Sequence, residues 1–320
     1  QSAVEFQEIT AAARGPRLLI SAGVHGDEYE PITAIHELLQ QLPGQLQRGT
    51  VTLIPVVNEA AFWRGDRVAE DGLDLARICP GDPGGSVTER AADELSTMIR
   101  QADYYIDLHT GGTALMVAPL AGYSLHPDAE VLDKQRQMAR AFNLPIVWGT
   151  DYRHKGRSLS IACESAIPAI YCEYEGGSRC SQAGTRDYVD GCLNVMGWLG
   201  MIDRDAPPSR VQHVVEDPRE GSGHLQVCNP SPSDGLFIPA VELGEFIDKG
   251  TAFGTVTDLA GQVKQTVVSE QQGVVIVLRS RPNVKQGDSL AVVMEMVEEI
   301  EPLTDEDEAV LDKIWNKLKE

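Results

Sequence analysis

The chain has 320 residues, 42% of them hydrophobic, and a formal net charge of −21 at pH 7. Its length favours two domains over one, and the hydrophobic share is sufficient for a buried core. So negative a charge argues against nucleic acid or an anionic membrane surface as a partner, and no apolar run approaches the length of a membrane span. An anionic small molecule remains compatible, because local arginines can override the mean field.

The cysteines indicate a reducing environment. The chain has six, irregularly spaced and without a CxxC pair. Structural thiols in a cytoplasmic protein are therefore expected. The first residue is Gln1 and not Met, so the sequence is also compatible with a trimmed leader.

The first two hundred residues alternate between short apolar runs and segments with helical periodicity. Strands are expected at 17–22, 50–57, 104–108, 113–119, 145–148 and 169–173, and helices at 31–42, 86–101, 128–142 and 185–199. This alternation predicts an α/β fold with a mostly parallel sheet and helices on both faces. A long polar segment, 58–85, interrupts it, and loops of that length are usually functional.

The pattern changes after Met201. Residues 203–210 have the composition of a linker, and 211–300 contain short strands between turns, at 235–239, 254–257, 273–278 and 290–294. We therefore expect a catalytic domain at 1–202 and a small β-barrel or sandwich at 211–300. A capping box at Thr304 and an apolar stripe predict a C-terminal amphipathic helix at 301–320.

The segment 17–30 combines a buried strand with two metal-binding side chains. The apolar run breaks at Gly23 and Gly26 into a loop that carries His25 and Glu28, and Pro31 opens the next helix. In open α/β sheets this carboxyl edge is where ligands bind. A lone HxxE pattern is weak evidence, but its position strengthens it.

A third ligand is expected from another strand end. His109 follows the buried run 105–108, and Asp107 lies on the same strand face, where it can accept the second ring N–H of a ligand histidine. The other five histidines are better explained as ordinary surface or core residues. Two histidines and a carboxylate are a common donor set for catalytic zinc.

A metal-activated water also needs a base. The strand 169–173 ends in Glu173, and Glu175 follows two residues later before a Gly pair. Because both glutamates point to the same strand face, the residues alone do not separate them, and either can also simply face solvent.

Taken together, these motifs resemble the succinylglutamate desuccinylase/aspartoacylase family, of the zinc carboxypeptidase-like superfamily and the bacterial predicted-deacylase type. The resemblance rests on HGDE at 25–28, DLHT at 107–110, and the strand that ends in glutamate near a Gly pair. The polar segment, with Asn58, Arg67 and DGLDLARICPG at 71–81, resembles the family's substrate loop. The β region is similar to the family's small C-terminal domain.

The resemblance implies one Zn²⁺ per chain, held by His25, Glu28 and His109. Glu173 matches the general base when Pro168 sets the register, and Glu175 when the Gly pair sets it; Glu173 is favoured. Here the base takes the proton of the metal-activated water and passes it to the leaving amine.

The resemblance also implies roles for the polar segment. Arg67 matches a residue that stabilises the oxyanion, Arg77 matches the arginine that grips a substrate carboxylate, and Asn58 belongs to the substrate-binding loop. One departure is Ala76, where the family usually has Asn. The carboxylate is therefore held differently here, or is absent from the substrate.

The implied function is zinc-dependent removal of an acyl group from a small N-acylated amino acid or related amide. Two alternatives stay open: a metallocarboxypeptidase acting on short peptides, and a metal- or ligand-binding protein without catalysis. The β domain is expected to cover the active site or mediate oligomerisation, so a homo-oligomer is compatible. A carrier domain modified at Lys249 is less favoured, because its flanking residues resemble neither a lipoyl nor a biotinyl motif.

Overall fold

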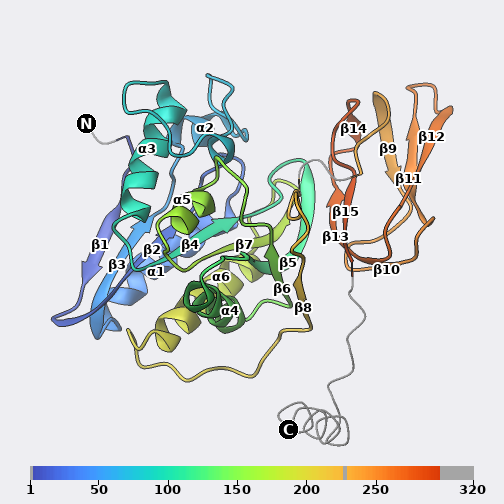
Figure 1. Ribbon diagram of the computed structural model, residues 1–320. Coiled ribbons are helices and arrows are strands. Elements are labelled where there is room, and N and C mark those ends of the chain that lie inside the picture. The colour runs from blue at the N-terminus through green and yellow to red at the C-terminus, as the bar shows by residue number, and fades with distance from the viewer. Residues whose placement is uncertain (1–2, 226–228, 296–320) are drawn as a thin grey trace, which may run out of the picture.

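The computed structural model describes residues 3–225 and 229–295. These residues form an 11-stranded mixed sheet flanked by helices, and a separate 4-stranded sheet (Figure 1). The predicted α/β class with a small additional β region is confirmed. Within the described residues, no helix combines the length and the apolar character that crossing a membrane requires.

The elements follow one another along the chain with short connections. In order they are β1 (Gln7–Thr10), β2 (Ala13–Ser21), α1 (Glu30–Gln41), η1 (Leu42–Gly44), β3 (Arg48–Ile54), α2 (Glu59–Arg64), η2 (Leu75–Arg77), α3 (Val87–Ile99), β4 (Tyr104–His109), β5 (Leu115–Ser124), α4 (Ala129–Phe142), β6 (Ile146–Thr150), α5 (Ser158–Glu164), β7 (Ala169–Gly176), α6 (Gln182–Trp198), β8 (His213–Glu216), β9 (Gly235–Pro239), β10 (Phe246–Ile247), β11 (Ala252–Thr257), β12 (Val263–Val268), β13 (Gly273–Arg279), β14 (Asn283–Val284) and β15 (Ala291–Glu295).

The centre of the large sheet is parallel. Strands β3, β2, β4 and β7 pair side by side in the same direction. Strand β5 then runs antiparallel to β7, and its other edge pairs with β13 near its start and with β6 further along. The sheet is therefore parallel where β2 and β4 end, and mixed around it.

Helices cover both faces of this sheet and bury its apolar side chains (Figure 1). On one face α1, α4 and α6 pack over a core that includes Leu38, Phe142 and Val195. On the other face α3 and α5 pack over a second core that includes Leu95 and Ile161. Burial of this kind contributes about 1.5–3 kcal/mol for each large side chain.

Local sequence signals account for most element boundaries. Pro31 lies in the first turn of α1, and Ser86 and Glu89 form the expected capping box of α3, with Glu89 accepting from the Ser86 N–H at 2.8 Å. Strand β1 and helix α5 were not predicted. Both are short, and α5 spans only 7 residues, too few to establish a helical period.

The region after the linker is built of strands, as predicted, but it is not confined to a second sheet. Strands β9, β11, β12 and β14 form the small sheet, and among residues 211–225 and 229–295 no helix occurs. Strand β8, however, pairs with β6, and β13 pairs with β5. Residues 213–216 thus extend the large sheet, which differs from the expected start of the β domain at 211.

The small sheet packs on the strands that lead back to the large one. Phe237 and Phe253 pack with Val275 and Val293 of β13 and β15 in one buried cluster. Residues 203–210 lie outside helices and strands, as expected of a linker, and Arg210 pairs with Asp187 of α6 at 2.7 Å. The division at 1–202, 203–210 and 211–300 stays a prediction, and the predicted helix at 301–320 lies outside the described residues.

The loop between β2 and α1 depends on glycine. Gly23 has a φ of 62°, which only glycine adopts readily. Gly26 lies against α2 so closely that an added Cβ would be 2.0 Å from the carbonyl carbon of Ala61. The loop that carries His25 and Glu28 is therefore held directly on the backbone of α2.

We expect Gly26→Ala to destabilise the protein by about 1–3 kcal/mol, because the new methyl group overlaps the α2 backbone. Urea unfolding followed by circular dichroism measures this change. Gly44→Ala is the matched control, since Gly44 has no neighbouring atom within 4 Å of an added Cβ. Equal stability of the two variants would contradict close packing at Gly26.

Candidate metal centre and catalytic pocket

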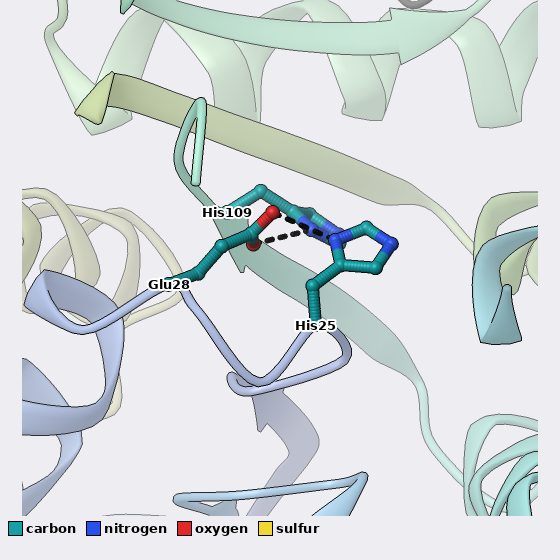
Figure 2. Close-up of side chains that lie close together, drawn as sticks. All are labelled: His25, Glu28 and His109. Carbon is teal, nitrogen blue, oxygen red and sulfur yellow. Dashed lines mark hydrogen bonds and ion pairs between the residues drawn. The ribbon is translucent and has the colours of Figure 1, made fainter. Parts of the chain in front are cut away.

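Three side chains from two distant segments meet at the carboxyl edge of the parallel strands. His25 Nδ1 lies 2.7 Å from Glu28 Oε1, and His109 Nδ1 lies 3.1 Å from Glu28 Oε2. Figure 2 shows the carboxylate between the two imidazole rings. One potential ligand atom from each residue lies within 4.8 Å of the others, and all three residues are buried.

Strand register explains why they meet. Strands β2 and β4 are parallel neighbours, with Ser21 opposite Asp107. His109 is the last residue of β4, while His25 and Glu28 lie on the loop that follows β2. Two sequence segments more than eighty residues apart therefore end at the same place.

The charges of the cluster favour a cation between the ligands. Burial opposes ionisation of Glu28, but the adjacent His25 and His109 lower its pKa below the usual range. Burial likewise opposes charge on His109, but Asp107 and Glu28 raise its pKa well above the usual value. A buried carboxylate that attracts positive charge on both sides, with two imidazoles, fits Zn²⁺ in donor type and number.

Asp107 orients His109. Its Oδ2 lies 3.0 Å from His109 Nε2, on the ring edge away from Glu28, as expected. Ser21 donates to its other oxygen at 2.8 Å, and Ser158 also donates to it. These contacts keep His109 Nδ1 directed at Glu28. The sequence analysis missed Ser158, because it lies at the start of the unpredicted helix α5.

Asp74 is a second carboxylate beside the ligands that the sequence analysis did not single out. Its Oδ1 lies 3.2 Å from His25 Nε2, and Arg67 Nη2 donates to its Oδ2 at 3.0 Å. Arg67 Nη1 also lies 3.9 Å from Glu28. The polar segment thus brings Arg67 next to the cluster, as predicted. The Asp74 position carries no separate sequence signal, since aspartate is common in loops.

The two candidate bases lie in different places. Glu173 is buried and lines the cavity with His25, Glu28 and His109, and its Oε2 has no hydrogen-bond partner among the described residues. Burial raises its pKa to about 8, the Glu28 charge adds to this effect, and His109 and Arg67 oppose it. An unpartnered carboxylate in a cavity is available to a bound molecule.

Glu175 faces elsewhere. Its backbone has a φ of 41°, so the alternation of the strand breaks before it, and the register with β5 shifts at the same point. Its carboxylate lies 3.7 Å from Arg179 and is not among the groups lining the cavity. The expectation that both glutamates share a face was therefore wrong.

The substrate-loop residues separate into two groups. Arg77 and Ala76 line the cavity, next to the metal cluster. Asn58 does not line it: its side-chain oxygen accepts from the Ala61 N–H at 3.2 Å and caps α2, and its Nδ2 donates to Thr88 at 3.4 Å. The position of Asn58 therefore does not support the expectation that it contacts substrate.

Four further cavity residues were missed because no motif marks them. Arg157 and His154 precede α5, Tyr171 lies on β7 two residues before Glu173, and His224 comes from the segment after β8. The alternation of β7 could have identified Tyr171, since it shares a face with Glu173. The other three reach the cavity only through tertiary packing.

The model of the family described as "Succinylglutamate desuccinylase/Aspartoacylase catalytic domain" matches residues 14–197, more than half of the chain. The chain belongs to this family. The resemblance based on the sequence motifs is thereby confirmed.

Two curated relatives in this family are named for deacylation. The N-alpha-acetyl-L-2,4-diaminobutyric acid deacetylase of Halomonas elongata is 29% identical over 91% of this chain and 86% of its own length. A succinylglutamate desuccinylase of Pseudomonas paraeruginosa is 31% identical over 44% of each chain.

Solved structures extend the similarity over both sheets. The product-bound ectoine utilization protein of Ruegeria pomeroyi has a TM-score of 0.83 at 27% identity and covers 91% of this chain and 88% of its own. A succinylglutamate desuccinylase/aspartoacylase structure from Rhodobacter sphaeroides has a TM-score of 0.81 at 27% identity, covering 92% and 90%.

Asp107→Asn should weaken metal retention about 10- to 100-fold, because an amide does not favour the His109 tautomer that presents Nδ1 to the metal. Competition with a chromogenic chelator measures this change. Asp103→Asn is the control, since Asp103 lies at the start of β4 and only accepts from the Arg17 N–H at 2.8 Å. Equal affinity in both variants would remove Asp107 from the metal centre.

Proposed function

We propose that the protein is a zinc-dependent amidohydrolase that removes the acyl group from a small N-acylated amino acid. The observation that supports it most is a buried His–Glu–His donor set sharing one cavity with the unpartnered Glu173 carboxylate. The names of the relatives support the same reaction class, since both are deacylating hydrolases. A cytoplasmic location and a homo-oligomeric state remain predictions.

His25, Glu28 and His109 would hold one Zn²⁺. When bound, such an ion supplies a Lewis acid that acidifies a water molecule and polarises a carbonyl group. Asp107 fixes the orientation of His109, and Asp74 contacts the other ring edge of His25. The protein itself therefore contributes a preorganised donor set.

Glu173 would act as the general base and then as the general acid. It accepts a proton from the attacking water and returns it to the nitrogen of the leaving amine. Its raised pKa suits the second step, since a carboxyl group with a pKa near 8 donates readily at neutral pH. Positive charge held by Glu28 would favour the ionised form needed for the first step.

Arg67 would stabilise the oxyanion that develops on the acyl carbon. Its guanidinium is held by Asp74 and lies beside Glu28, so it is oriented before substrate binds. Arg77 would bind a carboxylate of the substrate. Gly223 and Leu225, from the segment after β8, also line the cavity, which supports a small substrate over a peptide.

Glu173→Gln should lower kcat by about 10²–10⁴-fold in an assay of amine release from N-acetyl and N-succinyl amino acids, with zinc retained, because only proton transfer is lost. Glu175→Gln is the matched control, since Glu175 lies outside the cavity, and it should keep activity. The reverse result would assign the base to Glu175.

Elemental analysis should find about one zinc per chain, and His109→Ala should lose it, because two ligands do not retain the ion. His36→Ala on the exposed face of α1 is the control and should keep the metal. Chelator treatment should abolish amine release, and added Zn²⁺ should restore it. Full activity of a zinc-free preparation would contradict the proposal.

A further inference from the structure

One side of the cavity is built from arginine and histidine. Arg77 follows the polar segment, Arg157 and His154 precede α5, and His224 comes from the segment after β8. Arg157 Nη2 lies 3.3 Å from His224 Nδ1, and the His154 and His224 rings meet edge-on with centroids 4.4 Å apart. We call these four residues the basic wall.

The two guanidiniums of the basic wall have no acidic partner. Among residues 3–225 and 229–295, neither Arg77 nor Arg157 forms an ion pair with a carboxylate; Arg77 Nη1 donates only to the carbonyl of Ala76, at 2.8 Å. Arg67, in the same cavity, is by contrast paired with Asp74 at 3.0 Å. Two partly buried cations without a counter-charge are costly unless a ligand supplies one.

The histidines of the wall are neutral at pH 7. Burial lowers the pKa of His224 to about 4, and the positive charge of Arg157 adds to the effect. Burial and Arg157 also lower the pKa of His154, although the Ser222 carbonyl lies 2.6 Å from its Nε2. An arginine stays charged under the same conditions, so the wall carries two positive charges.

The acids that line the cavity are Glu28, Asp107 and Glu173, and all three belong to the metal cluster and the base beside it. A substrate ammonium group would therefore find no carboxylate on the basic wall. Ala76 also offers no side-chain amide here, so the two guanidiniums are the principal polar groups available to the amine half of a substrate.

We propose that the amine half of the substrate is an acidic amino acid, and that Arg157 selects its side-chain carboxylate while Arg77 binds its α-carboxylate. This inference rests on the proposed deacylase function and specifies its substrate class. It differs from the cationic amino acid in the name of the Halomonas elongata relative. A substrate with one carboxylate would leave one guanidinium without a counter-charge.

The first test compares near-isosteric substrates on the wild-type enzyme. N-acetylaspartate and N-acetylglutamate should each exceed their N-acetylasparagine and N-acetylglutamine counterparts in kcat/KM by about tenfold or more, because only the acids make a charge-assisted hydrogen bond. Nα-acetyl-2,4-diaminobutyrate should be the poorest substrate. Equal rates within each pair, or a preference for the cation, would overturn the inference.

The second test assigns the selectivity to Arg157. Arg157→Met should raise KM for the acidic substrates about tenfold with little change in kcat, and so remove the preference over the amides. Arg157→Lys, which keeps the charge, should retain part of it. Arg186→Met, an equal charge loss on an exposed helix position, should change nothing. An unchanged acid-to-amide ratio in a folded Arg157→Met variant would overturn the assignment.

Calorimetric binding of the free amino acids to the zinc-loaded protein separates this inference from the proposed function. Aspartate or glutamate should bind more tightly than asparagine or glutamine even if no N-acyl amino acid is hydrolysed. In that case the deacylase proposal fails and the basic wall stands. Hydrolysis of N-acyl amino acids with equal binding of acids and amides would support the enzyme and overturn the inference.

Discussion

The site depends on one buried carboxylate held between two imidazoles. Glu28 is fully enclosed, and such a group is costly unless positive charge surrounds it. His25 from the same loop and His109 from β4 provide partners on its two oxygens. The close packing of Gly26 on α2, the parallel pairing of β2 with β4, and the contacts of Asp107 all serve to keep this arrangement fixed.

Charge is divided across the cavity. The carboxylates that line it gather around the ligands and the neighbouring Glu173, while two arginines without acidic partners occupy the basic wall. The chain as a whole is strongly acidic, so these arginines are a local exception to a net charge of −21. Such an arrangement can hold a cation at one place and an anionic ligand beside it, which a uniform field could not do.

The segment after the linker contributes to the same cavity. Strand β8 extends the large sheet, and the residues that follow it place His224 and Leu225 at the cavity. Further along the chain, β13 pairs with β5, and β13 and β15 pack on the small sheet. The small sheet is therefore joined to the large one through shared strands, and the chain returns to the active region after leaving it.

Sequence alone was sufficient for the α/β class, the family, and the meeting of His25, Glu28 and His109, because strand ends in a parallel sheet share one edge and the motifs mark them. It also identified Asp107, since alternation along a strand is a local property. It did not separate Glu173 from Glu175, because the register shift that turns Glu175 away arises from pairing with β5. It placed Asn58 with the substrate, whereas the amide caps α2. Asp74, Arg157 and His224 came together only through packing between segments far apart in the chain, and no local pattern records such contacts.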